Sequence, residues 1–416
     1  MQPERDVRVK RAQRRQITWG RVDLDAEVPA DHEVRAIAAV VDKLDLRELY
    51  ADVRARGEIA GAPATDPKIL LGLWVYATSD GVGSGREIAR LVELHAAYRW
   101  LCGGVAVAYH RLDDFRSDHG DVLNELVTQL LARLMKHDLI DLQRVLQRVA
   151  QDGTRIRASA GAASFRSGET LERLMTEARA HLVEVTRAAT DHACTARHAA
   201  TMARVAKERL ARLAHALAEL PDVAAIKKKS GAKDATPRGS TTDPDARVMK
   251  MPDGGFRPAG SIQLATTTDA ARAIVGVSVT NRGSDQGQAT PRLEQIEART
   301  GVRPTELLVD GGYANHDAID QATAAGVTLY APVPKPRKAS EASEMPDQPP
   351  IDPHLPKPDD SDAVAAWRVR MGTDHAKQIY KQRAATAETV KAVCRRPTRY
   401  SLDTRSCRPR RGSQWR

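Results

Sequence analysis

Apolar residues recur at helical spacing through much of the first third of the chain. Residues 31–53 show this period, and Asp66, followed by a proline, is a capping side chain of the kind that begins a helix. The apolar run after it predicts a buried helix, and Ser84 is placed to cap the next one over 85–104. A further helix is predicted over 112–139. We expect a compact helical domain, compatible with helix-turn-helix DNA binding but also common in proteins that never touch DNA.

The pattern changes near Leu142, where apolar and polar residues alternate and β-branched residues become frequent. A strand is predicted around Val149–Ile156, and the long charged helical stretch over 168–222 is predicted to form an inserted hairpin. Residues 227–245 read as a loop. Three short strands, then helix, strand, helix and strand, lead through a proline-rich loop to a final helix over 362–395. This is the ribonuclease-H-like order, so we predict an α/β fold with a mixed sheet, preceded by an all-helical domain.

These patterns also predict the domain boundaries. We expect a basic N-terminal arm, a helical DNA-binding domain, a ribonuclease-H-like catalytic domain and an atypical arginine-rich tail, over residues 1–19, 20–141, 142–395 and 396–416. Within the catalytic domain, residues 168–222 would form the helical insertion and 223–245 a loop.

The net charge of +10 over 416 residues is concentrated at the two ends of the chain. Residues 1–15 carry +4 and residues 395–416 carry +7, which leaves the rest at −1. Basic ends of this kind often grip phosphate backbones, and solvated disordered ends have the same composition. No run of about 18 apolar residues and no signal peptide are found, so we expect no membrane partner. The four cysteines are far apart, which favours a reducing cytoplasm over disulfides or structural zinc.

Three acidic residues are candidates for chemistry. Asp152 lies in the first predicted strand, Asp310 ends a later one, and Glu388 lies on the final helix. Carboxylates at strand ends, next to glycines, suit a metal held close to a phosphate. Two Mg²⁺ or Mn²⁺ ions about 3.5–4 Å apart could clamp the attacking and leaving oxygens of a phosphoryl displacement. Each acid alone has an ordinary explanation, as a turn residue or a solvated helix face.

The chain resembles the DD(E) transposases of bacterial insertion sequences that carry a Y-R-E-K signature on the last helix. The resemblance covers most of residues 20–395 and is carried by VAQDGTRIRASAGAASFR, STTDPDARVMKMPDGGFRPA, NRGSDQGQ, LLVDGGYA, and the helix bearing Tyr380, Arg383, Glu388 and Arg395. The N-terminal stretch DPKILLGLWVYATSDGVGSGREIARL also resembles that family's helical domain.

By this resemblance, Asp152, Asp310 and Glu388 are the acids that bind two Mg²⁺ or Mn²⁺ ions. Tyr380 and Arg383 would position DNA phosphate or the helix itself, since arginine suits bidentate phosphate contacts. The commonest signature has three residues between its arginine and glutamate, whereas four stand here. The closing basic residue is then Arg395, or else Lys391. The implied partners are double-stranded DNA, as terminal inverted repeats and target, and a second copy of the chain in a bacterial, nucleoid-associated complex.

Residues 396–416 do not resemble the apolar closing helix that such an enzyme would have. Their arginine content and lack of apolar periodicity indicate an out-of-frame end, as in a frameshifted or truncated copy. Two alternatives therefore stay open beside an active transposase: a catalytically inactive remnant that only binds DNA, and a ribonuclease-H-like nuclease that cuts without strand transfer.

Two other motifs are weaker. The glycine-rich stretch over 81–85 lacks the GK[ST] ending of a phosphate loop and follows a helix, so it is predicted to be a turn. Among His192, Cys194 and His198, only the last two share a helix face, which does not make a zinc site.

Overall fold

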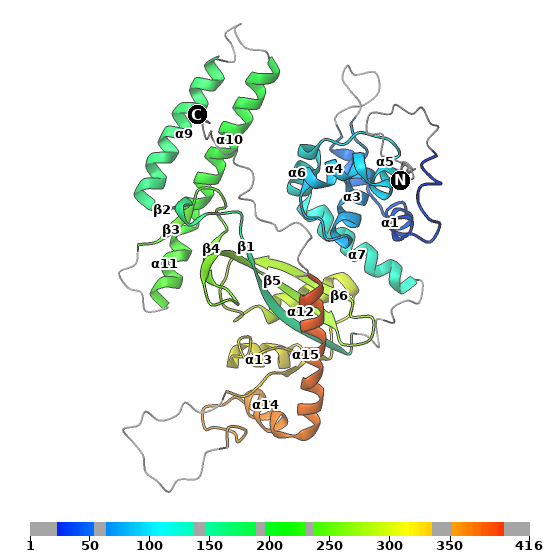
Figure 1. Ribbon diagram of the computed structural model, residues 1–416. Helices are drawn as coiled ribbons and strands as arrows, with labels where there is room; N and C mark the ends of the chain where they lie inside the picture. Colours follow the sequence, from blue (N-terminus) through cyan, green and yellow to red (C-terminus); the bar gives the residue numbers. More distant parts are fainter. Residues whose placement is uncertain are drawn as a thin grey trace, which may run out of the picture. The chain divides into compact units, whose positions relative to one another are not determined.

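The computed structural model describes residues 23–53, 64–136, 141, 146–188, 196–229, 236–334 and 352–394. They divide into two compact units with the boundary between Gln129 and Leu130 (Figure 1). The first unit is helical, and the second is a mixed α/β unit built on a curled sheet.

The helical unit contains α1 to α6 and the start of α7. Their bounds are α1 Glu33–Val41, α2 Arg47–Ala51, α3 Pro67–Ser79, α4 Gly85–Leu94, α5 Ala96–Cys102, α6 Tyr109–Asp118 and α7 Gly120–Lys136. Asp66 begins α3 as predicted, because its side chain accepts a hydrogen bond from the amide of Lys68 and Pro67 takes the first helical position. Ser84 occupies the N-cap position of α4 as predicted, although its side chain makes no capping hydrogen bond.

The prediction of one helix over 85–104 was wrong. His95 takes an extended backbone conformation, with φ −116° and ψ 127°, and separates α4 from α5. Its Nδ1 accepts a hydrogen bond from the amide of Ala97 at 3.3 Å, which caps the new helix. The predicted final helix is divided in the same way at Thr373, whose φ is −76° and ψ 148°. Periodicity alone does not show such breaks, since the apolar face continues on both sides of them.

One apolar core holds the helical unit together, and α3 lies at its centre. Leu73 is fully buried, as are Ile88 of α4 and Leu112 of α6. The indole of Trp74 donates a hydrogen bond to the carbonyl of Leu112 at 2.9 Å, so a buried polar group is satisfied within the core. The packing of α3 against α1, α5 and α6 therefore defines this unit.

The second unit is built on a six-stranded mixed sheet. In the order β4-β5-β1-β7-β8, with β6 also paired to β5, the strands are Arg247–Lys250, Phe256–Thr267, Arg148–Arg157, Glu306–Leu308 and Thr328–Tyr330, and β6 is Ile274–Thr280. The strand β1 is antiparallel to β5 and parallel to β7, which is parallel to β8. The turn between β4 and β5 contains Gly254 at φ +84°, a backbone conformation that glycine adopts readily.

Helices accompany the sheet and are inserted into its chain path. α12 (Ala289–Thr300) packs on β6, α13 (His316–Ala324) and α14 (Asp362–Gly372) on β8, and α15 (Asp374–Cys394) on β1 and β5. α9 (Gly168–Ala188) and α10 (Ala196–Ala218) form the predicted hairpin, side by side in Figure 1. At its base, β2 (Phe165–Ser167) pairs with β3 (Arg238–Ser240).

The predicted loop over 227–245 is partly structured. α11 runs over Leu220–Lys229, and β3 lies within the stretch that was predicted to be irregular. The polar composition of this stretch predicts a loop. β3 is only three residues long and its partner β2 is distant in sequence, so no local pattern indicates this strand.

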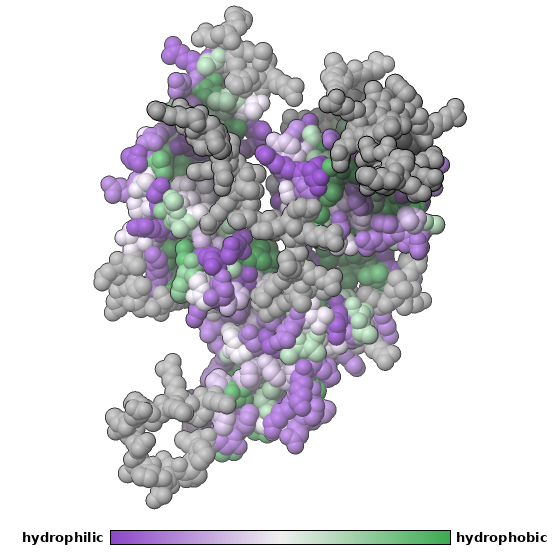
Figure 2. Space-filling model, viewed as in Figure 1, coloured by the Kyte–Doolittle hydropathy of each residue, from purple (hydrophilic) through white to green (hydrophobic). Residues whose placement is uncertain are grey.

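The polarity of the surface and the hydropathy of the helices bear on whether the chain could cross a membrane. Hydrophilic residues cover much of the face drawn in Figure 2, with hydrophobic residues in smaller patches. Within the described ranges, no helix combines the length and the hydropathy needed to cross a bilayer.

Leu73→Ala should lower the opening free energy of the helical unit by about 2–5 kcal/mol, because it removes a fully buried side chain and leaves a cavity. Val75→Ala is the matched control, since Val75 lies on the same helix and is 43% exposed. It should change that free energy by no more than about 0.5 kcal/mol. Amide hydrogen exchange in α3 of the full chain measures both. Equal effects would mean that α3 buries a different face.

Candidate active site

Asp152 and Asp310 are neighbours because of strand register. β1 and β7 run parallel, and their last described pair is Ala150 with Leu308. Each aspartate is two residues beyond that pair, so both side chains point to the same face of the sheet. Asp152 is only 7% exposed, and Asp310 follows directly after the buried end of β7. The structure therefore brings together two acids that are 158 residues apart in sequence.

Arg383 of α15 lies between the two carboxylates. Its guanidinium Nη2 is 3.1 Å from Asp152 Oδ2 and 3.5 Å from Asp310 Oδ2. The arginine side chain is 17% exposed, and its Nε has no hydrogen-bond partner among the described groups. A half-buried cation thus compensates the charge of two acids that would otherwise repel each other.

Tyr380 lies one turn earlier on the same helix and hydrogen-bonds to Arg383. Burial raises the pKa of the Tyr380 hydroxyl, and the nearby charges of Asp310 and Asp152 raise it further. The hydroxyl therefore stays protonated and remains available to donate a hydrogen bond. Tyr380 and Arg383, two of the signature residues proposed for this helix, therefore both lie at the acid pair.

Asp285 is a third acid at this place, and the sequence analysis did not single it out. Its Oδ1 accepts a hydrogen bond from Gln263 Nε2 at 2.7 Å, and Gln263 Oε1 in turn accepts one from the hydroxyl of Tyr313. Burial raises the pKa of Asp285, and the negative charges of Asp310 and Asp152 raise it further. The available signal was the segment NRGSDQGQ, which carried part of the family resemblance without any role assigned to its acid.

Gly153 allows this third acid to approach the strand. A Cβ atom at position 153 would lie 2.7 Å from Asp285 Oδ1 and 2.7 Å from Gln263 Nε2. Any side chain there would push the loop of Asp285 away from β1. The glycine after Asp152 therefore allows the loop that carries Asp285 to lie close to β1.

Glu388 is placed differently from the other predicted acid residues. It is exposed, and Ala387 occupies the position four residues after Arg383, where α15 is buried. One further residue turns a helix by about 100°, so the extra residue in the signature rotates Glu388 away from the face that carries Arg383. Lys391 lies on α15, but its side chain and Arg395 are outside the described residues.

A separate cluster of acids and histidine could hold a metal ion. His215 Nε2 lies 3.7 Å from Glu219 Oε1 and 3.4 Å from Asp245 Oδ1. In the described part of the chain, it is the only group of three such residues whose ligand atoms all lie within 4.8 Å of one another. Among the described residues, neither Glu388 nor Asp285 forms so tight a group with Asp152 and Asp310. Glu219 is already engaged, since its other oxygen accepts hydrogen bonds from Arg247 and Asn281.

A basic groove of about 650 Å³ lies beside the acid cluster. Arg155 of β1 belongs to its wall, and its guanidinium donates a hydrogen bond to the carbonyl of Gly283 at 2.8 Å, two residues before Asp285. The other cationic residues of the wall are Lys227, Arg238, Arg247 and Lys250, and the wall contains no carboxylate. A polyanion could follow this groove up to the acids.

Residues 22–118, which make up most of the helical unit, match the model of a family described as a transposase domain (DUF772). The match supports a transposase family. A transposase acts on DNA, so the match also implies DNA as the partner of this chain. No curated protein and no solved structure matches it. The matched transposase domain and the acid cluster lie in different units of the same chain.

Arg383→Gln should destabilise the sheet unit by on the order of 2 kcal/mol in metal-free buffer, because Asp152 and Asp310 lose their shared counter-charge. Added Mg²⁺ should recover part of the loss, since a cation that binds only the folded state stabilises it. Urea unfolding with and without Mg²⁺ measures both effects.

The matched control is Lys381→Gln, which removes an exposed charge from the same helix. It should leave the unfolding midpoint unchanged. The charge-compensating role of Arg383 would be refuted if both variants behaved alike.

Proposed function

We propose that this chain is the transposase of a bacterial insertion sequence, which cleaves the ends of its element and joins them to target DNA by DD(E) chemistry. The observation that carries the proposal is the pair of acids on adjacent parallel strands, bridged by Arg383, in a chain whose helical unit matches a transposase domain. The strand order supports a ribonuclease-H-like catalytic unit, in which a mixed sheet presents such acids at the ends of parallel strands.

The donor set fits a hard divalent cation. Asp152, Asp310 and Asp285 offer only oxygen atoms, and Mg²⁺ prefers carboxylates while keeping several waters. The guanidinium between two of these carboxylates shows that the place already favours positive charge. When bound there, Mg²⁺ or Mn²⁺, as one or two ions, would supply Lewis-acid charge for phosphoryl transfer.

The residues of the chain have distinct tasks in this proposal. Asp152 and Asp310 would hold the cation, and Arg383 with Tyr380 would orient the scissile phosphate through N–H and O–H donors. Water attacks phosphorus, and the bond to the 3′ oxygen breaks, which leaves a free 3′-OH at the end of the element. That hydroxyl then attacks a target phosphodiester in the same site, forming one P–O bond as another breaks.

The third carboxylate has two candidates. The family signature assigns it to Glu388, and the geometry favours Asp285, whose carboxylate lies against Gly153, the residue after Asp152. We propose Asp285 as the better placed ligand, because Glu388 is exposed on a different face of α15. The helical unit would grip the terminal inverted repeats, and two copies of the chain would pair the two ends.

A DNA-binding remnant without cleavage activity is the second candidate. The specific observation in its favour is Ala387, which stands at the helical position where the commonest signature places its glutamate. Such a protein would bind the repeats with strong salt dependence and leave them intact in the presence of metal.

Asp152→Asn and Asp310→Asn should each lower metal-dependent cleavage at least about 100-fold, because each removes a charged ligand oxygen next to the phosphate. The assay is Mn²⁺- or Mg²⁺-dependent cutting of a labelled duplex that carries the repeats flanking the gene. Asp374→Asn is the control, since that side chain is 96% exposed, and it should cut like the wild type. If the wild-type chain binds the duplex but does not cut it, the result would establish the DNA-binding remnant instead.

Asp285→Asn and Glu388→Gln separate the two candidates for the third acid. If Asp285 completes the site, its variant should cut at least about 10-fold more slowly and need more Mn²⁺, while Glu388→Gln changes the rate by less than about 3-fold. The reverse ranking would restore the signature assignment. Duplex binding in EDTA should be unchanged or tighter in Asp285→Asn, because the substitution removes negative charge near the phosphate.

A further inference from the structure

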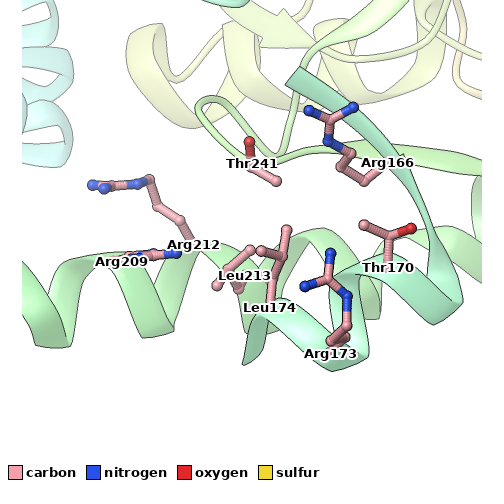
Figure 3. Close-up of a pocket in the computed structure, with 8 residues that line it drawn as sticks. All are labelled: Arg166, Thr170, Arg173, Leu174, Arg209, Arg212, Leu213 and Thr241. Carbon is pink, nitrogen blue, oxygen red and sulfur yellow. The ribbon is translucent and has the colours of Figure 1, made fainter. Parts of the chain in front are cut away.

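A second concave surface lies at the base of the helical hairpin, away from the acid cluster. We name it the arginine cavity, and its volume is about 540 Å³. Figure 3 shows Arg166 and Thr241 across the opening from the two helices. The residues that line it are Arg166, Thr170, Arg173, Leu174, Arg209, Arg212, Leu213 and Thr241.

The lining is cationic and contains no carboxylate. Arg173 is paired with Glu177, 2.5 Å away on the next turn of α9. The other three guanidinium groups, those of Arg166, Arg209 and Arg212, form no ion pair with any residue that the structure describes. Like charges that converge without counter-charge disfavour the folded state, so this arrangement calls for an anion from outside.

Packing fixes the walls of the cavity before any ligand arrives. Leu213 is 2% exposed and belongs to the core between α9 and α10, so the turn of α10 that carries Arg209 and Arg212 is anchored. Arg166 pairs with Gly239 in the β2–β3 ribbon. A Cβ at Gly239 would lie 2.8 Å from the carbonyl of Ala216, so the ribbon presses directly against α10. The arginines thus project from rigid elements, which reduces the entropy lost on binding.

We propose that the arginine cavity binds the phosphodiester backbone of DNA outside the cleavage centre. Arginine forks match phosphate oxygens bidentately, and hydrogen bonds from such donors to phosphate oxygens fix a protein on the DNA backbone. Three unpaired cations from two elements suit successive phosphates better than one small anion, because a DNA strand distributes its charges along its length. This inference rests on the proposed function for the identity of the polyanion.

The test uses the full chain and a short fluorescein-labelled duplex of mixed sequence, in EDTA, so that binding is measured without cleavage. The double variant Arg209→Gln/Arg212→Gln should bind more weakly. The slope of log K against log salt, measured between about 50 and 200 mM, should become shallower by about 2, or about 0.9 for each lost phosphate contact. Glutamine keeps the polar helical surface, and circular dichroism should show unchanged helix content.

The matched control is Arg179→Gln/Arg204→Gln, which removes the same charge from the hairpin, one arginine each from α9 and α10, at exposed positions outside the cavity. It should leave the slope within about 0.5 of the wild type, because those side chains contact no phosphate. Equal slopes in the two double variants would overturn the inference. So would a wild-type chain that fails to bind the duplex.

The cleavage assay distinguishes this failure from failure of the proposed function. If the wild type cuts DNA with Mn²⁺ but both variants share its slope, the cavity is rejected and the transposase proposal stands. If the slope depends on Arg209 and Arg212 but no cutting occurs, the cavity stands and the catalytic proposal falls. Inorganic phosphate could instead stabilise the wild-type chain but not the Arg209→Gln/Arg212→Gln variant, while the salt slope of duplex binding is the same in both. That result would assign the cavity to a free anion.

Discussion

The contact on which the sheet unit depends is the one between Arg383 and the two aspartates of neighbouring parallel strands. It joins β1, β7 and α15, which are far apart in sequence, at a single half-buried place. Two carboxylates that face each other at low exposure would repel, and one guanidinium offsets both. The sheet can therefore close around its acids before any cation arrives, so the acidic site does not depend on metal to fold. This separates the protein from small metal domains, in which binding and folding are a single event.

Acidic and basic residues occupy different places in the second unit. The acids gather at the ends of parallel strands, while cationic residues line part of the groove beside them and of the cavity under the hairpin. Cationic walls that lead to an acidic centre suit a polyanion whose backbone must be held in several places while one bond is broken. The helical unit adds a separate surface, in the part of the chain that matches a transposase domain.

Much of this arrangement could be predicted from the sequence, and the failures have physical causes. The strand around Asp152, the hairpin insertion and the meander follow from local period and turn residues, and the structure contains them. The contact between Asp152 and Arg383 was not predicted, because the family resemblance assigned Arg383 to DNA phosphate or to the helix itself and no local pattern encodes a contact over that separation. Asp285 was overlooked because an acid in a polar loop looks like any turn residue until Gly153 shows how closely the loop approaches. The extra residue between Arg383 and Glu388 rotates the glutamate side chain by about 100° around the helix. A spacing motif does not reveal this rotation unless the buried face of the helix is known.

The short ribbon of β2 and β3 has a consequence for how this chain can change over time. The hairpin enters and leaves through two strands that pair with each other, so its two ends are already neighbours. Lengthening, shortening or exchanging the hairpin would leave the alignment of β1 with β7 intact, although the insertion falls between the two aspartates in sequence. The hairpin, with the arginine cavity at its base, can therefore be replaced as a module while the acid cluster is inherited unaltered.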